Sequence, residues 1–325
     1  MKSFIKKGTD LRVFTSFLVI CLLVLSSSSF AQDSAAVEET PAPVKLKPVK
    51  NTFESIWILN NQTVFVPQKK SLEVDIQHRF GVVTNGYDDF WGFFAPSNIR
   101  LGVNYAPINR LNLGVGITKS NMLLDGNLKY SLITQTPHKY PVSVSYYANM
   151  AYDTRKDPDG GIFKYNSQRF SFFHELLIAR KIDDRLSIQG GISLSHQNSV
   201  DGYYINAKDD TTKVIFKEMK FDHFAFSLSG RLKLTDVTSI MFDYDQPITK
   251  HATNNPNPNL SLGFEFNTGG HSFQFFLGNY SFMSPQRDNL FNTNAPFTYT
   301  DKTTGKKVKG GQFLIGFNIT RLWNY

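Results

Sequence analysis

Two carboxylates stand two residues apart at Asp243 and Asp245, a spacing that puts both on one face of a β-strand. Such a pair could activate a water for hydrolysis if a facing strand supplied an aspartate and a histidine on the same side. Asp222 and His223 are adjacent, so their side chains point in opposite directions. Arg231 lies roughly diagonal to the pair across a short turn, and we favour an ion pair over catalysis.

A second candidate for chemistry is the pair His174 and His196, which a tight turn would bring to a similar height. A lipid-cleaving site would need a serine two residues from a histidine on the same face. The four positions that lie two residues from His174 or His196 hold Phe172, Leu176, Leu194 and Asn198, and none of them is a serine. We find no zinc-type histidine pair, nucleotide-binding glycine loop or nucleophile elbow, and we expect neither a metal nor a cofactor.

The elements that carry these residues have a two-residue period. In Ser71–Phe80 the odd positions are polar or charged and the even positions are apolar, apart from His78. This alternation predicts a β-strand with one apolar and one polar face, at the length of a tilted membrane-spanning strand. Eleven further segments show it: Asn98–Tyr105, Leu111–Thr118, Asn127–Gln135, Val142–Tyr152, Phe170–Lys181, Leu186–Asn198, His223–Leu234, Thr238–Asp245, Asn259–Asn267, His271–Gly278 and Gln312–Leu322. In Phe170–Lys181 the alternation is broken by Phe173 and Leu177.

The connections between these segments alternate between long and short, the pattern of outer-membrane barrels with short periplasmic turns and long outer loops. The polar face is mostly Ser, Gly, Asn, Gln and Thr, which suits a crowded lumen better than bulk water. We therefore predict an all-β protein, an antiparallel up-and-down transmembrane barrel of about twelve strands in the outer membrane. An even strand number places both termini in the periplasm. Short turns are expected at Asn109, Asp183, Asp236 and Gly269.

Four regions are expected along the chain. Residues 1–31 resemble an export signal, with basic residues before an apolar run and a small residue at Ala31. Residues 32–52 are rich in Pro, Ala and charge and predict a flexible periplasmic tether. Residues 53–66 have helical spacing at first and strand-like residues later, so they form either a plug or lid or an extended lead into the barrel. Residues 67–325 form the barrel.

Charge argues against a nucleic-acid partner. Without residues 1–31 the chain has 31 basic and 26 acidic residues, a net charge of +5, and they are scattered. The single Cys21 lies in the export signal, so no disulfide is expected. The charged residues on the polar faces are candidates to line the lumen: Glu73, Asp75, Arg79, Arg100, Lys129, Glu175, Arg231, Asp243, Asp245 and Glu265.

Several runs carry a resemblance to a known family. They are Gln77–Gly81, Asn98–Gly116, Asn127–Gln135, Leu176–Gln189 and His196–Asn198, within a similarity from Phe53 to the C-terminus. The chain resembles a family of predicted outer-membrane β-barrels of Bacteroidota. The family has no assigned activity, so the resemblance implies location and fold and transfers no catalytic residue.

The carboxylate pair resembles half of an omptin-type protease site, and the histidine pair resembles part of a phospholipase site. Both sites are incomplete, so we predict no enzyme. We expect a passive channel or a binding barrel for small solutes, in contact with outer-membrane lipid. The alternative is a non-conducting accessory subunit of an outer-membrane complex or a surface adhesin that acts through its long extracellular loops. Other outer-membrane or periplasmic proteins are then expected as partners. If acids and bases form a network across the lumen, Arg100→Ala should change conductance with little effect on folding.

Overall fold

The computed structural model describes residues 46–50, 52–158, 161–204, 215–300, 305 and 307–324. The described residues from Pro48 onward belong to one compact unit. The predicted export signal and most of the predicted tether lie outside the described residues. Within the described part of the chain, no helix is both long and apolar enough to span a membrane.

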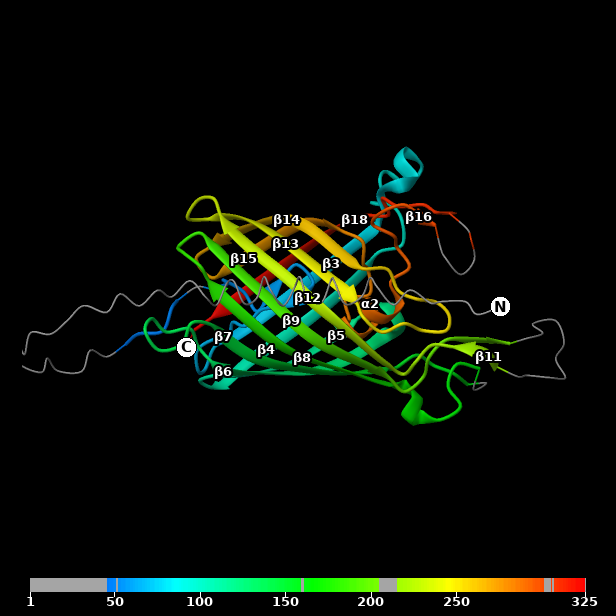
Figure 1. Cartoon of the computed structure of the whole chain (residues 1–325), viewed down its shortest axis with the longest axis horizontal. Coiled ribbons are helices and arrows are strands. Elements are labelled where there is room, and N and C mark those ends of the chain that lie inside the picture. Colours follow the sequence, from blue (N-terminus) through cyan, green and yellow to red (C-terminus); the bar gives the residue numbers. More distant parts are fainter. Residues whose placement is uncertain are drawn as a thin grey trace, which may run out of the picture. The chain divides into compact units, whose positions relative to one another are not determined.

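Twelve antiparallel strands close into a barrel in which each strand pairs with its neighbours along the chain (Figure 1). The first and last of them, β3 and β18, pair with each other and complete the circle. The strands are β3 Leu72–Val82, β4 Asn98–Ile108, β5 Leu111–Thr118, β6 Leu123–Ile133, β7 Ser143–Asp153, β8 Phe170–Lys181, β9 Leu186–Gln197, β12 Asp222–Lys233, β13 Thr238–Pro247, β14 Asn259–Thr268, β15 His271–Gly278 and β18 Leu314–Trp323. This confirms the predicted up-and-down barrel.

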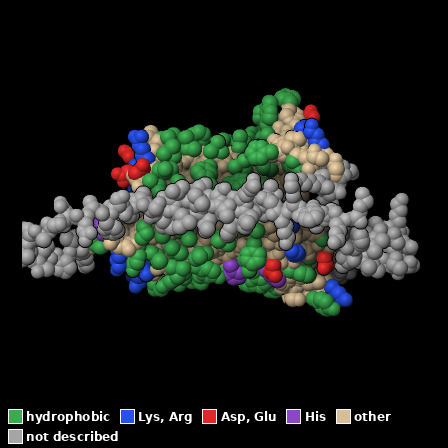
Figure 2. Space-filling model, viewed as in Figure 1, with side chains coloured by type: hydrophobic (Ala, Val, Ile, Leu, Met, Phe, Trp, Pro, Cys, Tyr) green, Lys and Arg blue, Asp and Glu red, His purple; other side chains and the backbone are tan. Residues whose placement is uncertain are grey.

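The two faces of each strand differ as the alternation predicts. In β3, Asp75, Gln77 and Arg79 are buried inside the barrel, whereas Ile76 is exposed on its outer surface. Hydrophobic side chains cover the visible wall, and most charged side chains in view lie near its two ends (Figure 2). A closed sheet satisfies the backbone of every strand, as a lipid environment demands.

The connections define two ends of the barrel. The short-turn end carries the turns between β4 and β5, β8 and β9, β12 and β13, and β14 and β15. The long-loop end carries two small hairpins, β10 Gly202–Tyr204 with β11 Ile215–Glu218 and β16 Tyr299–Thr300 with β17 Lys307–Val308. One boundary prediction is wrong, because β6 begins at Leu123 and not at Asn127. The connection before β6 is therefore shorter than the one after it, which reverses the predicted alternation there.

A substitution at Leu101 tests which face of the strands meets the lipid. It lies on the outer surface of β4 with 43% of its surface exposed. We expect Leu101→Arg to destabilise the barrel by about 2–4 kcal/mol if it meets the bilayer near its midplane. Urea unfolding in lipid vesicles measures this, with Leu101→Ala as the uncharged control. Equal stability of the two variants would contradict a lipid-facing Leu101.

The segment 53–66, called here the hairpin plug, lies inside the barrel. It forms a short hairpin of β1 Trp57–Ile58 and β2 Asn61–Gln62, so the helical interpretation of its first half is wrong. Its Ile58 and Leu59 have no exposed surface. Its chain enters at the short-turn end, where the N–H of Val49 donates to the carbonyl of Gln135 over 2.8 Å.

A second segment enters from the other end. The long connection between β15 and β18, expected to be an outer loop, folds a short helix into the barrel mouth (Figure 1). This helix, α2 Pro285–Phe291, buries Gln286, Asp288, Asn289 and Leu290. We call it the helix plug. The barrel is thus filled from both ends.

An aromatic lobe at residues 83–95 follows β3 at the long-loop end and rises beside the barrel in cyan (Figure 1). Its exposed rings are Tyr87, Phe90, Trp91, Phe93 and Phe94. The ring of Phe93 lies 4.6 Å from that of Phe80 on β3, centroid to centroid. The lobe therefore extends the apolar outer surface of the barrel.

Candidate functional site

The structure places all ten charged lumen candidates in the interior, each of them buried. They do not form one network across an open lumen. Some bind each other along the wall and others bind the hairpin plug. The four basic residues among them fall into three groups by these partners.

The first group is centred on Arg100. Its Nη1 lies 2.8 Å from Oδ1 of Asp75, and its Nη2 lies 2.8 Å from Oδ1 of Asp125. The side chain lies flat along the wall over Gly102 and Gly116, where an added Cβ would fall within 2.6 Å of its guanidinium nitrogens. Asp125 was missed in the sequence because its strand was predicted to begin at Asn127.

The second group is centred on Arg231. Its Nε donates to Oε2 of Glu265 over 2.6 Å, and its Nη2 lies 3.7 Å from Glu54 of the hairpin plug. The pairing expected from the sequence, between Arg231 and the carboxylates at Asp243 and Asp245, is wrong. The actual partner lies on β14, two strands away.

The third group binds the backbone of the hairpin plug. Lys129 donates through Nζ to the carbonyls of Ile56 and Phe65, each over 3.2 Å. Arg79 donates through Nη2 to the carbonyl of Leu59 over 3.5 Å, and its guanidinium lies over the ring of Phe276. These cations stabilise a plug and do not line a pore.

The paired carboxylates also bind the hairpin plug. Nδ2 of Asn61 lies 2.6 Å from Oδ1 of both Asp243 and Asp245. Asp243 further accepts from Ser229, and Asp245 from Asn259. One amide of the plug therefore bridges the two carboxylates that the sequence offered for hydrolysis.

Two other lumen acids are held differently. Glu175 accepts a hydrogen bond from Oγ of Ser227 over 2.8 Å. Oε1 of Glu73 is buried and has no hydrogen-bond partner within the described residues. Within the described residues, neither Glu73 nor Glu175 lies close enough to a basic side chain to form an ion pair.

Two glutamines hold the plug as a neighbouring strand would. Gln274 accepts from the N–H of Leu59 and donates to the carbonyl of Trp57. Gln189 accepts from the N–H of Val64 and donates to the carbonyl of Gln62. Each amide satisfies one donor and one acceptor of the plug, so the buried hairpin keeps its backbone hydrogen bonds.

Apolar residues on the lumen face complete the seat of the plug. Phe173 and Leu177, which break the alternation of β8, are buried in one cluster with Phe53 and Ile58 of the plug. Wall residues Tyr147, Met241 and Phe276 belong to the same cluster. The irregularity in the sequence therefore marks a binding surface for the plug.

The two plugs touch in the barrel interior. Nδ2 of Asn60 donates to Oδ2 of Asp288 over 3.1 Å. Asp288 also accepts from the N–H groups of Phe282 and Ser284, which fixes the helix plug. Burial raises the pKa of Asp288, and the hydrogen bond from Asn60 opposes that shift. The hairpin plug and the helix plug therefore meet inside the barrel.

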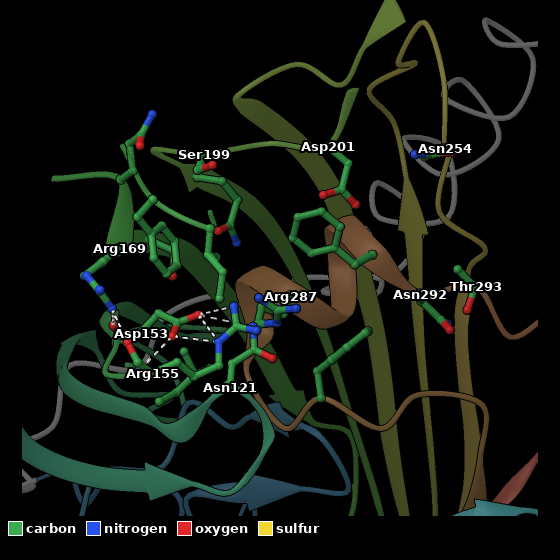
Figure 3. A pocket seen from close by; sticks show the side chains of 18 of the residues that line it. Asn121, Asp153, Arg155, Arg169, Ser199, Asp201, Asn254, Arg287, Asn292 and Thr293 are labelled. Carbon is green, nitrogen blue, oxygen red and sulfur yellow. Dashed lines mark hydrogen bonds and ion pairs between the residues drawn. The ribbon is translucent and has the colours of Figure 1, made fainter. Parts of the chain in front are cut away.

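A cavity of about 620 Å³ lies above the helix plug at the long-loop end. We call it the long-loop cavity. Its lining comes from β7, β8 and β9 and their loops, from the start of β6, from the loop before β14 and from the residues around α2 (Figure 3). It presents Asp153, Arg155, Arg169, Asp201 and Arg287, together with several amide and hydroxyl side chains. No signal in the sequence located it, because its residues come together only through the helix plug.

The histidines considered for catalysis lie elsewhere. Nδ1 of His174 lies 2.7 Å from the hydroxyl of Tyr146 on the outer surface. His196 lies 2.7 Å from Asp222, whereas the adjacent His223 is buried on the interior side and bonds to His251. In the described residues, no three His, Cys, Asp or Glu side chains are placed to share a metal ion.

Comparison with solved structures finds other barrels. An outer-membrane channel from Pseudomonas putida is 12% identical, with a TM-score of 0.45 over 80% of this chain and 97% of that one. The NanC porin is 6% identical, with a TM-score of 0.44 over 78% of this chain and 99% of that one. The KdgM porin is 7% identical, with a TM-score of 0.40 over 78% and 99%. No curated protein sequence matches.

A family model matches residues 53–323, from the start of the hairpin plug to the end of the last strand. Its description as a membrane-bound β-barrel agrees with the closed barrel, its apolar outer face and the resemblance read from the sequence. The bacterial lineage suggested by that resemblance stays a prediction. The chain belongs to the family of the membrane-bound β-barrel domain DUF5777.

Proposed function

We propose that this protein lies in the outer membrane, binds small polar solutes in the long-loop cavity, and lets them pass when its two plugs move. The observation that carries the proposal is the position of the cavity. Its floor is the helix plug, and the helix plug bonds directly to the hairpin plug through Asn60 and Asp288. A solute that displaces α2 therefore acts on the contact that closes the lumen.

The size and lining of the cavity support solute binding. Ligand pockets commonly enclose roughly 300–1,000 Å³ and fix their ligands with a few polar groups. The cavity falls in this range at about 620 Å³. Its rim consists of loops, which move more readily than strands. This makes it a suitable entry site.

Weakening the contact between the two plugs tests whether their movement opens the lumen. We call this contact, between Asn60 and Asp288, the gate. Asn60→Asp replaces a hydrogen-bond donor by a second carboxylate beside Asp288. Two adjacent carboxylates share one proton at low pH but repel each other once both ionise. We expect single-channel openings in planar bilayers to be more frequent than in the wild type, and more so at pH 8 than at pH 5.

Asn60→Ala is the matched control, because it removes the hydrogen bond to Asp288 and the one from Arg79 without adding a charge. It should open less often than Asn60→Asp and show little dependence on pH. Indistinguishable traces from Asn60→Asp and the wild type at both pH values would contradict the gate.

The orientation is part of the proposal. With the long-loop end outside, the cavity faces the medium, and the hairpin plug enters from the periplasm. Cysteines introduced at Thr298, in a long loop, and at Asp236, in a short turn, are both exposed. A membrane-impermeant maleimide on intact cells should label only Thr298→Cys. Labelling of Asp236→Cys alone would show that the barrel has the opposite orientation.

The other function expected from the sequence was a non-conducting accessory subunit or adhesin. The occluded interior is compatible with it, but the polar cavity seated on the helix plug favours solute binding. If the barrel carries no ion current after removal of the hairpin plug, the non-conducting alternative is favoured.

A further inference from the structure

The long-loop cavity contains a guanidinium group without an anionic partner in the described part of the chain. Nε of Arg287 is buried and makes no hydrogen bond. Its guanidinium carbon lies 5.0 Å from the ring centroid of Phe282 and 5.1 Å from that of Phe291. Aromatic faces attract a cation and fix its plane, but they leave its N–H donors unsatisfied.

The other charges of the cavity do not supply the missing anion. Asp153 is occupied by Arg155, whose Nε and Nη2 both bind its carboxylate. Within the described residues, Arg169 donates to the carbonyls of residues 153 and 155, over 2.9 and 2.7 Å, and to no carboxylate. Asp201 is exposed and forms no ion pair with a described residue. Three arginines and two aspartates line the cavity, which leaves a net charge of +1.

Burial makes the unpaired cation at Arg287 costly. Desolvation lowers the pKa of its guanidinium and Arg155 adds to that shift, whereas the carboxylates of Asp153, Asp288 and Asp201 oppose it without forming an ion pair with it. An anion bound at Arg287 would offset this cost, because guanidinium groups bind carboxylates and phosphates through paired N–H donors. Figure 3 shows Arg287 on α2 reaching toward Arg155 and Asp153 inside the cavity.

The neutral part of the lining indicates the rest of the ligand. Amide and hydroxyl side chains from six separate loops and strands surround the arginines: Asn121, Gln168, Ser171, Gln197, Ser199 and Asn292. Such groups both donate and accept hydrogen bonds, so they suit a molecule with several hydroxyl groups. The phenylalanine faces beside them can pack on the apolar side of a ring.

We propose that the long-loop cavity binds a small hydroxylated anion, with a carboxylate or phosphate group held by Arg287. The proposal rests on the proposed function and specifies its solute class. Arg169 adds positive potential at the same site. Because Arg287 is adjacent to Asp288, the anion binds beside the residue that contacts the hairpin plug.

Calorimetry on the purified full chain in detergent tests the proposal with four probes at equal ionic strength. They are gluconate, glucose 6-phosphate, neutral glucose and cationic glucosamine. We expect both anions, or one of them, to bind at least about tenfold more tightly than glucose, and glucosamine most weakly. The two anions distinguish a carboxylate site from a phosphate site.

Arg287→Gln removes the cation and should reduce the preference for the anions over glucose to less than about threefold. Arg287→Lys keeps the charge but loses the paired donors, so it should retain part of the preference. Arg185→Gln, which removes an exposed cation at the short-turn end, is the control and should leave binding unchanged. If Arg287→Gln does not fold, Arg287→Lys together with Arg169→Gln gives the same comparison.

Equal affinity for glucose and the anions would overturn the anion site, and so would an unchanged preference for the anions over glucose in Arg287→Gln. Neither result would contradict the proposed binding of small polar solutes. Absence of binding by every probe also overturns the anion site. The gate is judged separately, because conductance of the Asn60 variants needs no ligand.

Discussion

A barrel in which residues 53–66 are exchanged for a glycine-serine chain of equal length should conduct ions about tenfold or more above the wild type. The hairpin plug fills the interior between the wall and the helix plug, and a twelve-stranded barrel is wide enough to hold water once it is emptied. A glycine-serine chain has no apolar residues to pack against Phe173 and Leu177. Planar-bilayer recording of the two proteins gives the measurement.

The control exchanges residues 83–96, the aromatic lobe with one further residue, for the same linker. This segment is equally long but lies outside the lumen, so its loss should leave conductance at the wild-type level. An emptied barrel that folds and still carries no current would contradict the role of the hairpin plug in closure and would favour the non-conducting alternative, unless removal of the helix plug as well restores a current. In that case the helix plug alone would block the lumen.

Arg100→Ala should destabilise the barrel by about 3–5 kcal/mol, because it leaves two buried carboxylates without their cation. This replaces the expectation drawn from the sequence, in which Arg100 belonged to a loose network and its loss left folding unchanged. The structure gives Arg100 two carboxylate partners, Asp75 and Asp125, in the wall. Urea unfolding followed by tryptophan fluorescence measures the loss.

The triple variant Asp75→Asn, Arg100→Met and Asp125→Asn removes the whole buried triad. Replacing a complete buried ion cluster by uncharged residues is often nearly neutral, whereas breaking it is costly. We therefore expect the triple variant to recover most of the stability lost in Arg100→Ala. Equal losses in both would show that the arginine contributes by packing alone.

The barrel was predictable because its signal is local. Each strand sorts its side chains by parity, and a slip of one residue would expose the whole polar face. The segment Ser71–Phe80 already shows which residues face inward. The same rule failed at Leu123–Gly126, where Asp125 and a glycine look like a turn. The partner of Asp125 is Arg100, two strands away, and no local pattern encodes that contact.

The plugs were harder to predict for a different reason. The seat of the hairpin plug was visible in the sequence as apolar residues on a polar face, such as Phe173 and Leu177. Since a lumen face is expected to be polar, these residues appear in the sequence only as a break in the alternation. The helix plug has only seven residues in a long loop. Its position depends on contacts with β8, β9 and β12, which a short helix cannot specify locally.

The contacts of Leu59 bear on how the barrel assembles. Its carbonyl accepts from Asn318 on β18, over 2.5 Å, and from Arg79 on β3. Arg79 and Asn318 bond to each other across 239 residues of sequence, at the seam where the last strand meets the first. Joining such distant segments is the slow step expected of a high-contact-order sheet. A hairpin already attached to β3 offers β18 a docking point before their ladder forms, and so acts as an internal template for ring closure.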